Sequence, residues 1–297
     1  MEGMRCLLVI AVFGGSKFAN SASPTYDYEA QGPRTWPRTF PMCNGSMQSP
    51  IDVPEERALS SELPPLVYQG YWDRRVEATL TNTGLTAEVS VEDWPTPATL
   101  SGGPLRGVYQ FSNLHFHWGP NSSVGSEHTL TGERYSMEAH VVHFKQEYGN
   151  VTNAYSYPDG IAVVAFFLEV DSWIPNLQLS RLVEAVMQVE QLDSTATLPL
   201  RDATKWFHHD ATESEYYTYQ GSLTTPPCYQ VATWIIYPSV ISMAERQVAV
   251  FRRLRSTTGS RLTSNYRPIQ PLNGREVEFA EGNSGQLNHL GEGYVRV

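Results

Sequence analysis

Two histidines stand one residue apart in the segment NLHFHWG, residues 113–119. The aromatic residues around them predict a β-strand, in which side chains at positions i and i+2 point to the same face. His115 and His117 would then converge, while Phe116 faces the opposite layer. Two imidazoles on one side of a strand can hold one metal ion, but such a pair also occurs as packed, hydrogen-bonded core histidines. The spacing alone leaves both interpretations open.

A third imidazole is available in the segment MEAHVVHF, residues 137–144, which predicts a second strand. On that strand Glu138 and His140 share one face. Three neutral imidazoles with a fourth position left to water describe an open, catalytic zinc site rather than a closed structural one. The carboxylate of Glu138 can accept the second ring proton of a nearby histidine ligand and so set its tautomer.

Strand patterns recur through most of the chain and must position these side chains. They cover residues 76–84, 85–93, 109–118, 137–145, 161–170 and 229–237. A helix is predicted over 176–192 from an apolar stripe, and another from Ser242, which forms a capping box with Glu245. No repeat or linker divides the chain, so one β-rich domain with a few peripheral helices is expected.

Composition narrows the class of partner. The 297 residues are 41% hydrophobic and 18% charged, with a formal net charge of -10. This is a globular composition with ample material for a core. Nucleic acids and anionic membrane surfaces call for clustered Lys and Arg, so neither is expected as a partner. The oligomeric state is not indicated by the sequence.

The N-terminus predicts export. Arg5 precedes an apolar run at 6–13 and then small and polar residues, the order of a secretory signal peptide. We assign residues 1–22 to the signal, with approximate cleavage, and 23–297 to the mature chain; a disordered or buried N-terminal segment is the alternative. No other run is long enough to span a membrane, and the C-terminal end lacks the apolar tail of a lipid-anchor signal. A secreted, unanchored extracellular protein is expected.

Two other features agree with export. Glycosylation sequons occur at Asn44, Asn121 and Asn150, although each triplet also arises by chance. Removal of the signal would leave Cys43 and Cys228 as the only cysteines. In an oxidising compartment such a pair most simply forms one disulfide, with two unpaired buried thiols as the alternative.

Four segments together resemble the α-class carbonic anhydrases of the secreted type, over about residues 26–272. They are CNGSMQSPIDV (43–53), LHFHWG (114–119), SEHTLTGERYSMEAHVVHF (126–144) and GSLTTPPC (221–228). The resemblance implies a β-rich α+β fold, one domain on a large, mostly antiparallel central sheet, with a C-terminal tail from about residue 273. It implies zinc-dependent, reversible hydration of carbon dioxide to bicarbonate, and inhibition by sulfonamides and small anions.

The resemblance also implies roles for individual residues. The zinc ligands are His115, His117 and His140. Their orienting partners are Asn113, the main-chain carbonyl of Asn265, and Glu138. The residues implied to orient the nucleophile are Thr224 and Glu127, with His128 and Tyr219 in a supporting hydrogen-bond network. Those lining the carbon dioxide pocket are Val142, Val163, Leu223, Thr225 and Trp234. Cys43 and Cys228 match positions that pair as a disulfide in exported relatives.

Two positions depart from the family pattern. Asn113 stands where Gln is common, so either the strand approaches more closely or a water bridges the gap. Leu85 stands where fast relatives carry a proton-relaying histidine, so slow or buffer-dependent proton release is expected unless Glu88 or a buffer substitutes. The alternative function is a catalytically weak or silent extracellular binding or matrix module of the same fold. Ester hydrolysis would use the same zinc chemistry as a side activity.

Overall fold

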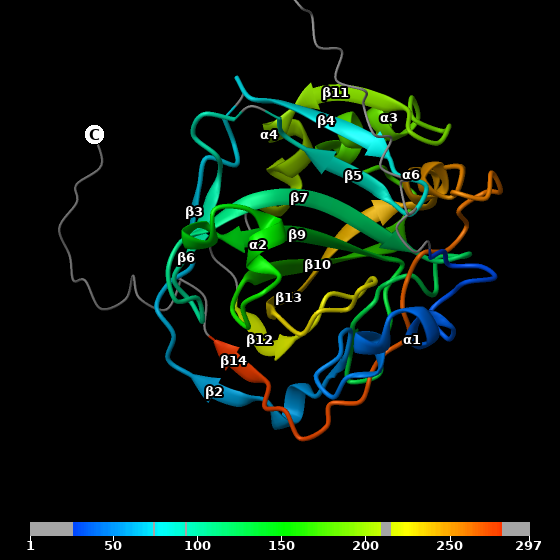
Figure 1. Ribbon diagram of the computed structural model, residues 1–297. Coiled ribbons are helices and arrows are strands. Elements are labelled where there is room, and N and C mark those ends of the chain that lie inside the picture. Colours follow the sequence, from blue (N-terminus) through cyan, green and yellow to red (C-terminus); the bar gives the residue numbers. More distant parts are fainter. Residues whose placement is uncertain (1–25, 74, 93, 209–214, 281–297) are drawn as a thin grey trace, which may run out of the picture.

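A large mixed β-sheet organises the chain. The computed structural model describes residues 26–73, 75–92, 94–208 and 215–280, so the expected signal peptide lies outside it. Within these residues twelve strands form one sheet, whose main path runs β11-β4-β5-β7-β9-β10-β13-β12-β14-β2 (Figure 1). The strands are β2 (Leu59–Ser61), β3 (Val67–Gln69), β4 (Glu77–Asn82), β5 (Ala87–Ser90), β6 (Thr99–Ser101), β7 (Tyr109–Trp118), β9 (Met137–Lys145), β10 (Ile161–Ser172), β11 (Thr195–Pro199), β12 (Tyr216–Gly221), β13 (Ala232–Ala244) and β14 (Glu278–Ala280).

Most neighbouring strands in this sheet are antiparallel, as expected. The exceptions are β10 with β13 and β14 with β2, which pair in parallel. A separate two-stranded parallel sheet joins β1 (Asp52–Val53) to β8 (Thr129–Leu130). The fold class expected from the sequence is therefore confirmed.

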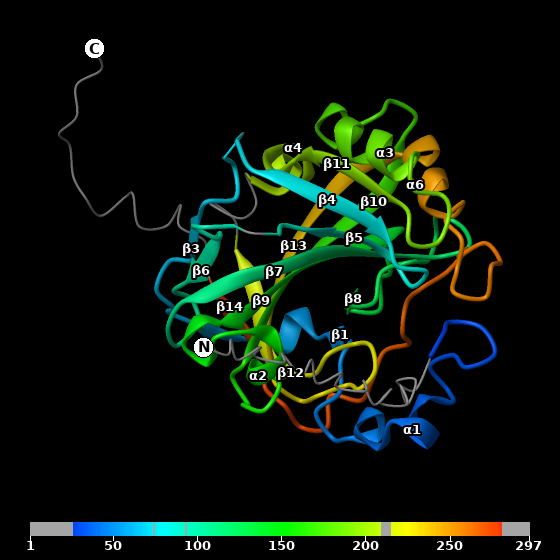
Figure 2. The ribbon, with the colours of Figure 1, turned by 45° about the horizontal axis from the view of Figure 1, so that its top comes forward.

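Short helices surround the sheet. The α-helices of the described residues are α1 (Trp36–Thr39), α2 (Val151–Ala154), α3 (Ser180–Val186), α4 (Leu200–Thr204) and α6 (Glu245–Phe251). The 3-10 turns are η1 (Pro41–Asn44), η2 (Glu55–Arg57), η3 (Gln146–Tyr148), η4 (Leu177–Leu179) and η5 (Lys205–Phe207). In both ribbon views α3, α4 and α6 lie on one side of the sheet and α1 lies on the other (Figures 1 and 2). No helix in the described part of the chain is long and apolar enough to cross a membrane.

Both helix predictions need correction. The helix predicted over 176–192 is the short turn η4 followed by α3, because i→i+3 hydrogen bonds after Val186 end the α-helix. The predicted capping box is wrong. Ser242 lies in β13, paired with Glu169 of β10, and α6 begins only at Glu245. Pairing with a neighbouring strand has overridden a short local signal.

The sheet also extends further along the chain than expected. β14 pairs with β12 on one side and with β2 on the other, so the fold runs to Ala280. The tail expected from about residue 273 therefore includes part of the sheet.

The two faces of the sheet carry different cores. On one face Phe116 packs against Trp206 and Phe251, beneath the α3, α4 and α6 helices. The other face carries a second apolar cluster that includes Val142 and Trp234. Since strand side chains alternate, burying Phe116 on the helix side turns its two neighbours, both histidines, toward the second face.

Candidate metal centre

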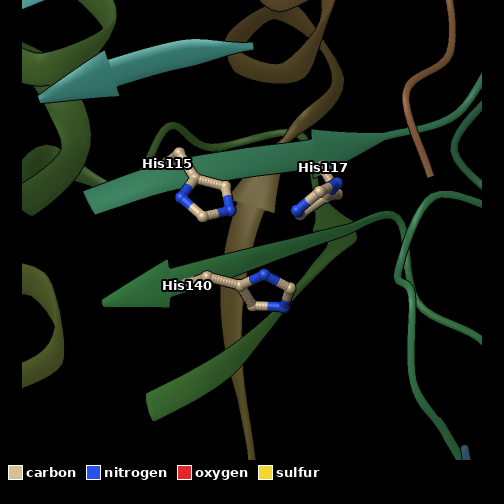
Figure 3. Close-up of side chains that lie close together, drawn as sticks. All are labelled: His115, His117 and His140. Atoms are coloured by element: carbon tan, nitrogen blue, oxygen red, sulfur yellow. The ribbon is translucent and has the colours of Figure 1, made fainter. Parts of the chain in front are cut away.

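Three histidines from two adjacent strands face one another (Figure 3). His115 and His117 lie on β7, and His140 lies on β9, directly opposite His115 in the antiparallel register. The ring centroids are 5.1 Å apart for His115 and His117, 5.2 Å for His115 and His140, and 4.6 Å for His117 and His140. One nitrogen from each ring lies within 4.8 Å of the others, so the three can hold one metal ion.

Burial favours the neutral form of two of these imidazoles, His115 and His117. His117 and His140 are each 1% exposed, and His115 is partly buried. Burial and the two neighbouring imidazoles hold the pKa of His115 well below its usual value. Burial also lowers the pKa of His117, although the carboxylate of Glu127 opposes that effect. Neutral imidazole is the form that binds a metal ion.

Hydrogen bonds set the tautomers of the three rings. The Nδ1 atom of His117 donates to the main-chain oxygen of Asn265 at 2.8 Å, and Nε2 of His140 donates to Oε1 of Glu138 at 2.6 Å. The Nε2 atom of His117 is buried and has no hydrogen-bond partner in the described part of the chain. An unpartnered ring nitrogen facing two other imidazoles fits a bound cation, so the donor set suits Zn²⁺.

Asn113 reaches its histidine directly. Its Oδ1 atom lies 2.8 Å from Nδ1 of His115, so no bridging water is needed. The register of β7 against β9 shifts between Phe111 and Asn113, and such an irregularity re-aims the side chains beside it. The shorter carboxamide therefore still reaches the His115 ring.

Replacing Asn113 with Ala should weaken zinc binding about 10–100-fold, because the His115 ring loses the acceptor that orients it. Competition with a chelator of known affinity measures this change. Asn113→Gln provides the matched control, since it keeps the carboxamide. Equal zinc affinities for Asn113→Ala and the unmodified chain would show that the contact does not support the metal.

Glu138 connects the centre to a buried polar network. Its Oε1 atom also accepts from Nδ1 of His128 at 2.7 Å, and its Oε2 accepts from the main-chain N–H groups of Glu127 and His128. Burial alone would raise the pKa of Glu138, but the contacts with His128 and His140 hold it well below its usual range. The Nε2 atom of His128 lies 2.8 Å from the hydroxyl of Tyr219. His128 and Tyr219, the residues expected to form a supporting hydrogen-bond network, therefore lie together beside Glu138.

Glu127 is fully buried beside the centre. Its Oε1 accepts from the main-chain N–H of Arg267 at 2.7 Å, and its Oε2 lies 3.4 Å from Nε2 of His117. That Oε2 atom has no hydrogen-bond partner among the described residues. The expected hydrogen bond from the Thr224 hydroxyl to Glu127 is not found among the described residues, although the Thr224 side chain is also buried.

An apolar wall stands next to the histidines. Val142, Val163 and Trp234 are neighbours across β9, β10 and β13, and each is at least nine-tenths buried. Leu223 packs against the same cluster, and the indole of Trp234 lies 4.9 Å from the His140 ring. Thr225 is partly buried and follows Thr224 in the loop between β12 and β13. Four of the five expected pocket residues therefore share one apolar cluster.

Leu85 lies in the turn between β4 and β5, and Asn265 connects it to His117. Its main-chain oxygen accepts from the Nδ2 atom of Asn265 at 3.0 Å, and the main-chain oxygen of the same asparagine accepts from His117. Glu88 pairs with His115 across β5 and β7, and burial raises its pKa.

The two cysteines form a disulfide. Cys43 and Cys228 are joined by an S–S bond of 2.01 Å across 185 residues of sequence. This confirms the expected pairing. The bond ties η1 to the loop between β12 and β13, which also carries Thr224.

Replacing both cysteines with Ser should lower the free energy of unfolding by about 5 kcal/mol, the chain-entropy value for a loop of this length. Chemical denaturation of the two proteins, with mass spectrometry of the unreduced chain, measures the effect. A midpoint unchanged by the double substitution would show that the bond does not stabilise the fold.

The three sequon asparagines are exposed, as glycosylation requires. Asn44 ends η1, Asn121 lies in the loop after β7, and Asn150 caps α2 by accepting from the N–H of Asn153.

Arg267 is a buried residue that the sequence did not single out. Its guanidinium donates to the side chain of Gln48 and to the main-chain oxygens of Ser49 and Cys43, and it lies 5.9 Å from the Trp36 ring. It therefore fastens the N-terminal segment beside Glu127, whose Oε1 it also contacts through its main chain. The available signal was the position of Arg267, two residues after Asn265.

The fold and the site define a β-sheet protein with three converging histidines that could hold one metal ion. The family model for the eukaryotic-type carbonic anhydrases matches residues 31–281. Similar curated proteins are carbonic anhydrase 7 of Mus musculus, 36% identical over 83% of this chain and 93% of that protein, and carbonic anhydrase 7 of Homo sapiens, 35% identical over the same shares. Carbonic anhydrase 1 of Monodelphis domestica is 34% identical over 86% of this chain and 98% of that protein. The chain belongs to the eukaryotic-type carbonic anhydrase family, the lyases that interconvert carbon dioxide and bicarbonate.

Proposed function

We propose that His115, His117 and His140 hold Zn²⁺ and that the chain hydrates carbon dioxide reversibly, with slow proton release. The observation that carries the proposal is the set of three converging imidazoles, in which the buried Nε2 atom of His117 has no hydrogen-bond partner from the residues that the structure describes. Bound Zn²⁺ supplies a Lewis acid that brings the pKa of water to about 7, a value known from carbonic anhydrases themselves.

Thr224 and Glu127 orient the attacking oxygen in this proposal. The Oε2 atom of Glu127, which has no hydrogen-bond partner among the described residues, would accept a hydrogen bond from the Thr224 hydroxyl. Because its own proton is then engaged, the Thr224 oxygen can only accept a hydrogen bond. It would accept one from the attacking oxygen and so orient a lone pair of that oxygen toward the substrate. The support for these roles is the burial of both side chains and the unpartnered carboxylate oxygen.

Carbon dioxide binds against the apolar wall in this proposal. Carbon dioxide carries no charge, so contact with hydrophobic side chains removes apolar surface from water and favours binding. Val142, Val163, Leu223 and Trp234 provide that surface beside His140. Thr225, on the same loop as Thr224, contributes a polar edge where bicarbonate leaves. Sulfonamides and small anions would compete for the same space.

Proton transfer to solvent is the slow step in this proposal. Leu85 has no titratable group, so the proton leaves directly to water or through a buffer molecule. An acid of pKa about 7 releases its proton to water at no more than ~10⁴ s⁻¹, since recombination is limited by diffusion. Glu88 is the nearby carboxylate that could relay the proton instead.

One experiment separates the enzyme from its alternative. We expect one zinc ion per chain and carbon dioxide hydration that rises with buffer concentration. Zinc without hydration would favour a silent extracellular binding or matrix module. A chain lacking both would overturn the enzymatic proposal.

We further propose that the chain is exported and glycosylated. The disulfide supports an oxidising compartment, and the three exposed sequons support glycan attachment. Expression in animal cells should release a protein that starts near residue 23 and gains mobility on a gel after glycosidase treatment. A protein that stays inside the cell and still carries residues 1–22 would contradict the signal-peptide assignment.

A further inference from the structure

Three large apolar side chains protrude from the loop that joins β10 to α3. Trp173 is 86% exposed, Ile174 is 56% exposed and Leu177 is 79% exposed. We call residues 173–177 the Trp173 loop. Single exposed hydrophobic residues are common on protein surfaces, but three within five residues form a patch that calls for an explanation.

Buried polar contacts hold this loop in place. The side-chain oxygen of Gln247, a residue 4% exposed, accepts from the main-chain N–H of Asn176 at 2.8 Å, and its Nε2 donates to the main-chain oxygen of Asn176 at 2.9 Å. The side-chain nitrogen of Asn176 donates to the main-chain oxygen of Ser242 at 3.0 Å. Asn176 is thus fastened to both α6 and β13. The apolar side chains are therefore presented by an anchored segment, which lowers the entropic cost of binding through them.

The size of the patch disfavours a protein partner. A fully buried aromatic side chain removes about 150–250 Å² from water, so the three side chains together offer on the order of 400 Å². A stable protein interface buries about 800 Å² on each partner, about twice that area. A lipid surface needs no complementary partner, because its interfacial layer accepts a few apolar side chains and favours tryptophan at headgroup level.

The charges near the patch select the kind of lipid. Arg181 on α3 is paired with Glu184 at 2.9 Å, and Asp171 at the end of β10 is exposed. The whole chain carries a formal net charge of -10. Neither the surroundings nor the whole molecule attracts anionic headgroups, so a zwitterionic surface is the matching partner.

We propose that the Trp173 loop inserts into the surface of zwitterionic lipid bilayers and so holds the enzyme reversibly at membranes. The loop precedes α3, which packs on the sheet face opposite the histidines, so docking leaves the metal centre open to substrate. Membrane binding through this loop is distinct from a spanning helix or a lipid anchor.

Sedimentation with phosphatidylcholine vesicles tests the proposal on the full mature chain. We expect binding that persists in 1 M salt and is not strengthened by phosphatidylserine. The double variant Trp173→Ser/Leu177→Ser should lower the partition coefficient by about tenfold or more. The reason is that burial of each large apolar side chain in the lipid surface favours binding. Leu59→Ser is the matched control, since Leu59 is 50% exposed on β2, at the edge of the sheet.

Hydration activity verifies that each variant is folded, and it should not change. If the double variant is inactive, the single variant Trp173→Gln replaces it. Equal partition coefficients for the unmodified chain and the variants would overturn the proposal. Binding confined to anionic vesicles and abolished by salt would also overturn it. A dimer in gel filtration that the variants disrupt, without vesicle binding, would assign the patch to a second copy of the chain.

Discussion

His117→Ala should abolish both zinc binding and carbon dioxide hydration. The buried Nε2 atom of His117 has no hydrogen-bond partner within the described ranges of the chain, and its Nδ1 atom donates to the main-chain oxygen of Asn265. Removing His117 leaves two imidazoles, too few for the three-ligand centre. The loss should exceed the roughly 10–100-fold effect of removing an orienting partner. Metal analysis after dialysis and a stopped-flow hydration assay measure the two losses.

His143→Gln is the matched control for this substitution. His143 lies on the same strand as His140 but packs on the opposite face, against Tyr71 and Phe111, and is equally buried. Its variant should keep one zinc ion per chain. Full zinc occupancy in His117→Ala, or equal metal loss in both variants, would contradict the assigned ligand set.

Leu85→His should raise turnover by up to about 100-fold in dilute buffer. In the proposed mechanism direct proton release would limit the unmodified chain to ~10⁴ s⁻¹, whereas the fast zinc-hydroxide enzyme reaches ~10⁶ s⁻¹. The ratio kcat/KM should change little, because proton release follows the carbon dioxide step. Hydration rates across a series of imidazole concentrations measure both quantities.

Leu85→Asn provides the control, since it is polar but does not titrate near neutral pH. It should remain as slow and as buffer-dependent as the unmodified chain. Glu88→Gln tests the other candidate relay, and a fall in turnover at low buffer would assign the relay to Glu88. The inference about Leu85 would fail if the unmodified chain were already fast at every buffer concentration.

Strand periodicity explains why the shared faces of these side chains were predictable. In the HFH segment the period of two places both imidazoles on one face, and the same rule places Glu138 beside His140. The pairing of Cys43 with Cys228 was also predictable, because removal of the predicted signal peptide would leave only these two cysteines. These inferences need only the local backbone or simple counting.

Other features depended on partners distant in sequence. The contact of Asn113 with His115 depends on a register shift against β9, and Ser242 became a strand residue because β10 pairs with it. The position of Glu127 beside the histidines depends on two such contacts. The main-chain N–H of Arg267 donates to its Oε1 atom, and its own N–H donates to Glu138 of β9.

Alternation along a strand is a local property, so the residue pattern was enough to predict that His115 shares a face with His117, and Glu138 with His140. The tertiary structure decided how those side chains meet: the register that sets His115 against His140, the extension of the sheet to Ala280, and the exposure of the Trp173 loop. Strand register and surface exposure depend on the packing of segments far apart in the chain, which no local pattern contains.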